Sequence, residues 1–444
     1  MTTNSRVDIG QLLDAAQWSG YSKYLVSLVA MTVVFDGIDN QLLGIVIPTI
    51  MQEWGVARSA FAPVVSLGYM GMMIGGSIAG FAGDRFGRRT ALLWSVVVFG
   101  VTTLGAAMVH DITSLGVLRF LTGLGLGGAM PNAAALTAEY VPSRQRAFAV
   151  TLTIVCVPLG GTFAGLLGIR MLPVLGWRTL FVLGGIIPIA AALVLRFVMP
   201  ESPRFLSRHP ARWNELVAVL RRMGQHLDDD VAFEDKAEQS TAKVSIGSLF
   251  RPEFRRDTVA LWAAFFCCLL SVYLGFSWLA ALLTGAGFAT SIASTGITVF
   301  NLGGVVGALV GGIAIGRFGS RTSMLAMAAA AVLSAGLLSL MEIAPAANLR
   351  LLLVLVTLAG ASINGVQTTM YALATHVYPS VVRASGVGSA VAFGRSGAIL
   401  AGYLGPWTIA LGGTTAFFGA VATMMTATFI ALALVQRHVP AQRR

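Results

Sequence analysis

The ten residues Gly80–Arg89 read Gly-Phe-Ala-Gly-Asp-Arg-Phe-Gly-Arg-Arg, and a degraded copy, Gly-Ile-Ala-Ile-Gly-Arg-Phe-Gly-Ser-Arg, forms Gly312–Arg321. The copies lie 232 positions apart in a chain of 444 residues, and each lies between two long apolar runs. A second pair of segments has nearly the same offset, because Glu139–Ala147 is echoed at His376–Ala384, 237 positions later. Two matches at almost one offset indicate a tandem duplication of about half of the chain.

The composition is that of a membrane protein. Hydrophobic residues make up 56% of the chain and charged residues only 11%, whereas a soluble domain carries about 25% charged residues. Crossing the hydrocarbon core takes about 20 apolar residues in a helix. Twelve runs are long enough, at 23–50, 60–83, 90–109, 112–139, 146–170, 178–199, 257–284, 291–316, 322–342, 348–376, 383–411 and 413–435. We therefore predict an all-α integral membrane protein with twelve transmembrane helices in two pseudo-symmetric six-helix bundles.

A long polar stretch divides these runs into six and six. We predict a cytoplasmic N-terminal segment, a first bundle, a cytoplasmic central loop, a second bundle and a cytoplasmic tail, at 1–22, 23–199, 200–256, 257–435 and 436–444. Within the loop, Ala211–Met223 places Leu216, Val219 and Leu220 on one face, which predicts a short amphipathic helix. The loop either ties the bundles together or offers a docking surface to a regulator.

The formal net charge of +11 is distributed according to membrane topology and does not indicate a nucleic-acid partner. Basic residues gather in alternate connections, which include the polar stretch and the tail, and the opposite connections hold few of them. The clustered arginines are Arg85, Arg88, Arg89, Arg144, Arg146, Arg317, Arg321 and Arg383. This bias predicts that both termini are cytoplasmic, in a multi-pass protein of the cytoplasmic (inner) membrane. Cys156, Cys267 and Cys268 lie inside predicted spans, so we expect neither a disulfide nor a metal site.

Four charged residues lie inside predicted spans: Asp36 and Asp39 in the first, Arg119 in the fourth and Arg395 in the eleventh. Facing lipid, each would cost about 2.5–3.5 kcal/mol, so they are expected to point inward and pair. They are either structural ion pairs or functional groups. A low-dielectric cavity favours the protonated form of a carboxylic acid, which can then carry a proton. An arginine stays charged, and its planar fork matches a carboxylate.

The repeated motif resembles that of the major facilitator superfamily, in which two six-helix halves enclose a site near the bilayer midplane. The resemblance covers essentially the whole chain. It implies that the motif glycines form a tight turn and that the charges form a conformational latch, although a basic anchor with a tight turn would also explain the arginines. The residues assigned to gating or to this latch are Gly80, Asp84, Arg85, Gly87, Arg88, Glu139, Arg146, Arg317 and Gly319. Because Gly316 replaces the motif aspartate, the second latch should be weaker. His376, the repeat equivalent of Glu139, is either a titrating switch or a histidine with no special role.

The sequence Asp36-Gly-Ile-Asp39, together with Arg119 and Arg395, resembles the aromatic acid:proton symporter family within that superfamily. The resemblance implies uptake of benzoate- or hydroxybenzoate-like carboxylates with protons. On this resemblance Asp36, Asp39, Arg119 and Arg395 match functional motif positions. We predict that Asp36, Asp39 and Arg119 couple transport to protons and that Arg395 binds the substrate carboxylate. The segment Pro200–Arg204 also occurs in branches that carry sugars or other organic ions, which leaves such a facilitator as the alternative.

Further polar and aromatic span residues are expected to line the substrate cavity, since an aromatic ring is held by aromatic walls with a few polar groups. The candidates are Asn364, Gln367, Tyr371, Tyr273, Trp278 and Asn301. For some of them a structural role is the competing interpretation, because Trp marks membrane interfaces and Asn bridges helices.

Other classes of protein fit less well. A membrane sensor of an organic acid would need a signalling domain, which the polar stretch is too short to supply. No nucleophile–base pair, metal-ligand spacing or phosphate loop predicts an enzyme. We expect no cofactor beyond the proton gradient, and a functional monomer.

Overall fold

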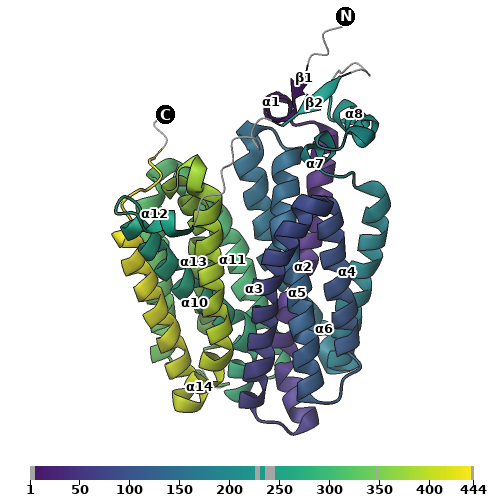
Figure 1. Cartoon of the computed structure of the whole chain (residues 1–444). Helices are drawn as coiled ribbons and strands as arrows, with labels where there is room; N and C mark the ends of the chain where they lie inside the picture. Colours follow the sequence, from purple (N-terminus) through teal and green to yellow (C-terminus); the bar gives the residue numbers. More distant parts are fainter. Residues whose placement is uncertain (1–5, 226–230, 236–245, 346–347, 442–444) are drawn as a thin grey trace, which may run out of the picture.

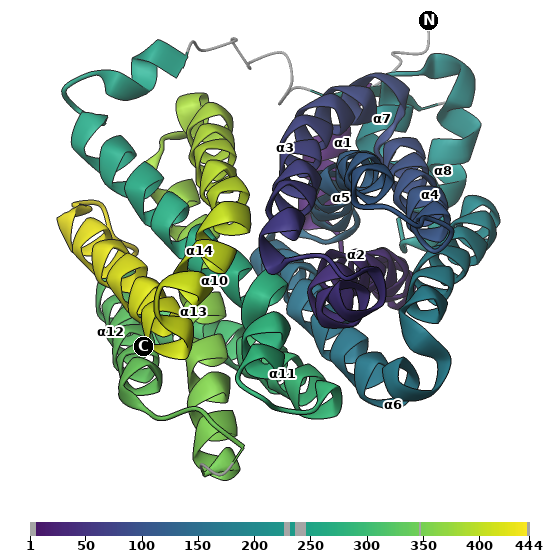
Figure 2. The same cartoon turned by 90° about the horizontal axis from the view of Figure 1, so that it is seen from below.

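The computed structural model describes residues 6–225, 231–235, 246–345 and 348–441. Within these residues, ten helices are long and apolar enough to cross a membrane. Figures 1 and 2 show them as two groups lying side by side. The first group holds α2 (Gly20–Trp54), α3 (Phe61–Phe86), α4 (Arg88–Ala106), α5 (Ile112–Tyr140) and α6 (Ser143–Val198), and the second holds α10 (Arg255–Gly285), α11 (Thr290–Phe318), α12 (Ser320–Leu340), α13 (Leu349–Val377) and α14 (Ser380–Leu434).

Ten helices give twelve crossings because two of them fold back on themselves. At 1.5 Å per residue, a straight helix of the 56 residues of α6 would be roughly 84 Å long, far more than the hydrocarbon core of about 30 Å. The backbone of α6 leaves the helical region at Gly176 (φ 72°), and that of α14 does so at Gly412 and Gly413. Each helix therefore crosses twice, and the predicted fold of twelve transmembrane helices is confirmed.

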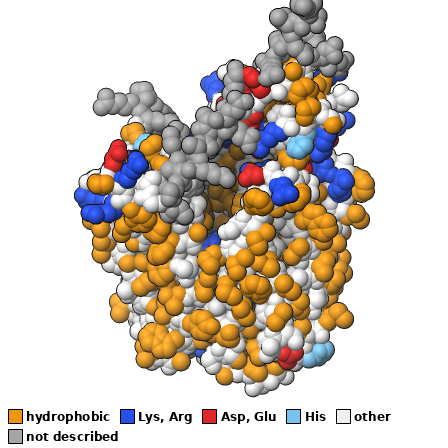
Figure 3. Space-filling view, in the orientation of Figure 1, with side chains coloured by type: hydrophobic (Ala, Val, Ile, Leu, Met, Phe, Trp, Pro, Cys, Tyr) orange, Lys and Arg blue, Asp and Glu red, His pale blue; other side chains and the backbone are white. Residues whose placement is uncertain are grey.

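The surface carries the apolar band that is expected of a protein embedded in a membrane. In Figure 3, apolar side chains cover the middle of the visible face, and Lys and Arg gather at the end that carries both termini. We call this the terminal end. The first copy of the motif lies here, where Gly87 (φ 102°) turns the chain from α3 into α4. Gly319 (φ 79°) makes the equivalent turn between α11 and α12. Both positions favour glycine because other residues rarely adopt these angles.

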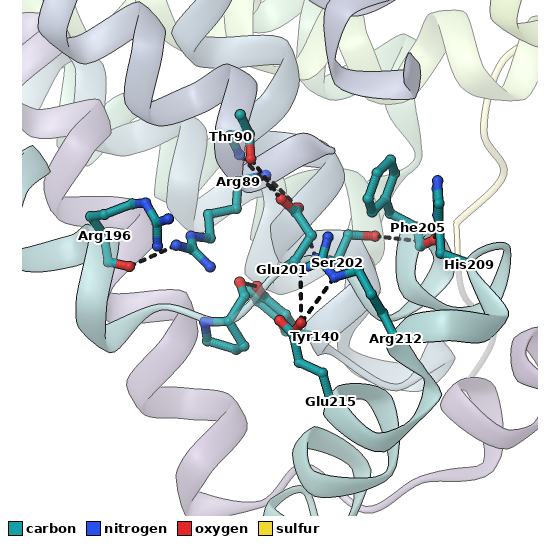
Figure 4. Close-up of polar contacts among 11 residues, drawn as sticks. Arg89, Thr90, Tyr140, Arg196, Glu201, Ser202, Phe205, His209, Arg212 and Glu215 are labelled. Carbon is teal, nitrogen blue, oxygen red and sulfur yellow. Dashed lines mark hydrogen bonds and ion pairs between the residues drawn. The ribbon is translucent and has the colours of Figure 1, made fainter. Parts of the chain in front are cut away.

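Each of these turns is bound by the segment that follows the last crossing of its own half. After α6, the Glu201 carboxylate accepts hydrogen bonds from the backbone N–H groups of Arg89 (2.8 Å) and Thr90 (3.3 Å) at the start of α4 (Figure 4). A carboxylate is favourable there because the helix N-terminus is partly positive. After α14, the carbonyl of Val439 accepts from the backbone N–H of Ser320 (2.9 Å) at the start of α12.

A small cap covers the terminal end of the first group. It consists of β1 (Arg6–Asp8), α1 (Ile9–Ala15), α7 (Pro203–Ser207), η2 (Pro210–Arg212), α8 (Trp213–Arg222) and β2 (Ala232–Glu234), with β1 and β2 paired in parallel. Its own apolar cluster joins α1 to α7 and α8 through Ile9, Leu206 and Leu216. An ion pair between Arg146 and Asp14 attaches the cap to α6. The amphipathic helix predicted at 211–223 is present as α8, whereas the pairing of β1 with the central loop was not predicted.

Glycines allow α2 and α6 to pack with their backbones in contact. A Cβ on Gly37 of α2 would overlap the carbonyl of Val157, and one on Gly160 of α6 would overlap the carbonyl of Val34. Small residues that let backbones approach are typical of membrane helix interfaces.

We therefore expect Gly37→Ala to destabilise the first group by about 1–3 kcal/mol, the usual cost of overpacking. The measurement is the midpoint of thermal unfolding in detergent. Gly336→Ala in α12 is the control, because nothing lies within 4 Å of a Cβ there. Equal midpoints for the two variants would contradict this account of the helix contact.

Candidate functional site

Asp36, Arg119 and Arg395 line spaces between the two groups of helices, and Asp39 is bonded to Arg119 within the first group. Asp36 (3% exposed) and Asp39 (0%) project from α2, and Arg119 (5%) projects from α5. Arg395, from the first crossing of α14, is half-buried. The burial of charged groups in such a region requires compensation inside the protein.

Asp39 and Arg119 compensate each other within the first group. The Nη1 atom of Arg119 donates to Oδ1 of Asp39 at 2.9 Å, and the hydroxyl of Thr103 in α4 donates to Oδ2. Both carboxylate oxygens are therefore bonded. The Nε atom of Arg119 has no partner among the described residues, so the pair is not saturated.

Asp36 and Arg395 have no such partnership. They line one cavity, and within the described part of the chain no ion pair joins them. The Oδ1 atom of Asp36 is buried without a partner. Nη1 of Arg395 donates to the backbone carbonyl of Met72 in α3 at 2.6 Å, across the boundary between the groups. Gly76 makes this reach possible, because a Cβ there would lie 2.7 Å from Nη1.

The walls of this cavity suit a ring that bears a carboxylate. Aromatic side chains come from α10 and α13 in the second group, namely Tyr273, Phe276 and Tyr371. The amides of Asn364 and Gln367 on α13 also face the cavity. Buried polar atoms without partners are rare in proteins, and at a cavity they indicate a place for a ligand or water.

A smaller hollow connects this cavity to the Asp39–Arg119 pair. It is lined by Arg119, Tyr69 and Ser277, and it shares Asn40, Met72 and Leu126 with the larger cavity. The hollow thus reaches Arg119, the partner of Asp39, while Asp36 and Arg395 line the larger cavity.

Two sequence candidates lie elsewhere and require a correction. Trp278 is fully buried, and its Nε1 atom donates to the carbonyl of Ala401 at 3.0 Å. Asn301 forms a reciprocal amide pair with Gln41, with N–O distances of 2.7 and 2.6 Å. Neither residue is among those that line the cavity, and the polar group of each is bonded to a structural partner.

The amide pair belongs to a set of polar contacts that join the two groups. Tyr69 and Ser277 share a hydrogen bond of 2.6 Å, and the Ser66 hydroxyl donates to the carbonyl of Ile399 at 2.8 Å. These contacts lie at the middle of the helices or toward the end opposite the terminal end. The groups are therefore closed against each other on the side away from the cap, and in Figure 1 the helices diverge toward the labelled termini.

The residues assigned to the latch lie at the terminal end. Arg88 forms an ion pair with Asp84, and Glu139 accepts a hydrogen bond from Ser202. Arg146 binds Asp14 of the cap. In both motif copies the arginine lies over the ring of the next residue, as Arg85 lies over Phe86 and Arg317 over Phe318.

Sequence reasoning missed several residues that position the site. Thr103 donates to Asp39, Gln41 pairs with Asn301, and Glu201 caps α4. The Pro-Glu-Ser-Pro segment was a signal for Glu201. The side chain of His376 is exposed, and no group of residues that could hold a metal ion occurs in the described ranges.

Comparisons with known proteins agree with this architecture. The chain is 35% identical to a gallate transporter of Pseudomonas putida, over 91% of this chain and 90% of that protein. It is 36% identical to the 4-hydroxybenzoate transporter PcaK of Acinetobacter baylyi, over 91% and 88%. The partially occluded inward-open xylose transporter XylE of Escherichia coli superposes with a TM-score of 0.71 at 16% identity, over 93% and 97%.

The sequence profile described as Major Facilitator Superfamily matches residues 29–296 and 261–444, which together cover most of the chain. The chain therefore belongs to the Major Facilitator Superfamily, and it is a multi-pass membrane transporter and not an enzyme.

Proposed function

We propose that this transporter imports aromatic carboxylates together with protons by alternating access. The observation that carries the proposal is the cavity between the two groups, which is lined by an arginine and an unpartnered carboxylate among aromatic walls. The names of the two relatives, a gallate transporter and a 4-hydroxybenzoate transporter, support the same class of substrate.

In this proposal Arg395 binds the substrate carboxylate. It is the only arginine that lines the larger cavity among the described residues, and its planar fork can bind both oxygens of a carboxylate. The ring then lies against Tyr273, Phe276 and Tyr371. Ring hydroxyls, where present, are within the reach of the amides of Asn364 and Gln367, which supply both donors and acceptors.

Charge balance couples the substrate to a proton. The cavity offers one cation, Arg395, to two anions, the substrate and Asp36. An unpaired ionised carboxylate is very costly in such a site, so binding of the substrate favours protonation of Asp36. Asp39 is bonded by Arg119 and Thr103, and it would change its bonding in a later step. The adjoining hollow gives Arg119 the space to exchange one partner for another.

Alternating access would come from rocking of the halves 23–199 and 257–435 around this site. The latch residues, among them Asp84, Arg88 and Glu139, would act at the terminal end. We place that end and both termini in the cytoplasm, and the protein in the inner membrane as a functional monomer. With this orientation, the contacts described above close the outer side of the transporter.

Purified protein in proteoliposomes should accumulate labelled 4-hydroxybenzoate or gallate when the outside is acidic, because each anion enters with at least one proton. A protonophore should abolish the accumulation. Labelled xylose serves as the control and should not accumulate. Accumulation that depends neither on the pH gradient nor on the protonophore would refute proton coupling. Uptake of xylose alone would refute the substrate class.

Replacing each aspartate by asparagine should have a different effect at the two positions. Asp36→Asn imitates the protonated acid, so exchange of substrate across the membrane should persist while accumulation against a gradient is lost. Asp39→Asn leaves Arg119 buried without its anion, which typically costs about 3–5 kcal/mol of stability. Thermal unfolding and the two transport assays together test this division, and normal accumulation by Asp36→Asn would exclude that residue as the proton carrier.

Substitution at the arginine should weaken substrate binding. Arg395→Lys keeps the charge but loses the fork, and Gly76→Ala pushes the guanidinium away from its position beside α3. Both are expected to raise the Kd of 4-hydroxybenzoate by about tenfold, roughly the 1.5 kcal/mol of one charge-assisted hydrogen bond. Gly312→Ala is the matched glycine control, since its Cβ would meet nothing within 4 Å. An unchanged Kd in folded Arg395→Ala would show that this residue is not the anchor.

A further inference from the structure

The outer face of the first group carries a groove between α4 and the second crossing of α6. Its walls are formed by Leu93, Trp94 and Val97 on α4 and by Ile189 and Leu193 on α6, and its empty volume is about 880 Å³. From Arg89 to Val97 the groove spans nine residues of α4, and the eight steps between them rise roughly 12 Å at 1.5 Å per residue. It therefore runs from the terminal end into the apolar band.

A second groove lies on the other side of the Trp94 side chain. It is lined by Ile78, Ala82 and Phe86 of α3, and it shares Thr90 and Trp94 of α4 with the first groove. Its empty volume is about 1140 Å³. The side chain of Trp94 is 65% exposed, so it stands as a ridge between two apolar grooves that begin at the same level.

Two arginines lie at the mouth of the first groove. Arg89 and Arg196 both line it, and Figure 4 shows the ends of their side chains turned toward each other. Arg89 donates through Nη2 to the backbone carbonyl of Arg196 at 2.6 Å, and its Nε is buried without a partner. For the Arg196 side chain, the described residues provide no ion pair.

The carboxylates near the mouth of the groove do not neutralise its two arginines. Glu201 directs its carboxylate oxygens to the backbone N–H groups at the start of α4 and to the Thr90 hydroxyl. Glu215 is paired with Arg212 through a contact of 2.7 Å. Two adjacent guanidinium groups repel each other, so this mouth attracts an anion.

We propose that this surface is a binding site for one anionic glycerophospholipid. The phosphate would lie against Arg89 and Arg196, and the two acyl chains would lie in the two grooves on either side of Trp94. Basic pockets at the membrane edge of transmembrane helices suit anionic headgroups. A free anion would use only the mouth, whereas a two-chain lipid accounts for both the charge and the paired grooves.

Quenching of Trp94 fluorescence by brominated acyl chains tests the site directly. The protein is placed in phosphatidylcholine vesicles that contain a fixed fraction of brominated phosphatidylglycerol or brominated phosphatidylcholine. The contribution of Trp94 is the difference between the unaltered chain and Trp94→Phe. We expect brominated phosphatidylglycerol to quench Trp94 at a lower fraction, and Arg196→Gln to reduce this preference by roughly fivefold, the effect of one basic residue at an anionic surface.

Three controls make the test decisive. Arg196→Lys keeps the charge and should keep the preference. Arg144→Gln removes an exposed arginine at the same end but outside the groove, and it should change nothing. Soluble glycerol 3-phosphate, which lacks acyl chains, should not displace the lipid. Equal quenching by the two lipids, an equal effect of Arg144→Gln, or displacement by glycerol phosphate would each overturn the proposal.

Discussion

The constraint on which this structure depends is that a charge buried in the membrane must find its compensation inside the protein. The first group of helices supplies this compensation by itself at Asp39, whose two oxygens are bonded by Arg119 and Thr103. In the cavity the charges are less well compensated by the described residues, because one oxygen of Asp36 has no partner among them and Arg395 donates to a backbone carbonyl. Among the described residues, Asp39 and Arg119 thus form an ion pair, whereas Asp36 and Arg395 form none and lie between the two halves.

Backbone packing decides where these charges can reach. Gly76 removes the side chain that would stand in the path of Arg395, and Gly161 does the same for the amide pair of Gln41 and Asn301, since a Cβ on Gly161 would overlap both amides. Each glycine therefore permits a polar contact between the two groups. A contact of this kind can form in one conformation and break in another at modest cost, because amide pairs exchange readily for water.

The sequence predicted the parts of the fold that local signals control. Long apolar runs identified the crossings, and the predicted break between the runs 383–411 and 413–435 coincides with the reversal of α14 at Gly412 and Gly413. Two of the charges inside the runs, Asp36 and Arg395, line the cavity. Partners separated by many residues could not be predicted, because the pairing of Asn301 with Gln41, or of β1 with β2, leaves no periodic pattern in either segment.

The duplication itself has become asymmetric at the terminal end. In the first half the motif turn is bound by a carboxylate, Glu201, while in the second half the equivalent turn is bound by neutral groups, because the Val439 carbonyl accepts from the Ser320 N–H and the Val439 N–H donates to the Ser320 hydroxyl. The second copy also has Gly316 where the first has Asp84. Hydrogen bonds to a charged group are stronger than those between neutral groups. The first half therefore holds its turn more firmly and also carries the cap. If the halves rock as proposed, the second half is the one whose terminal end is freer to rearrange.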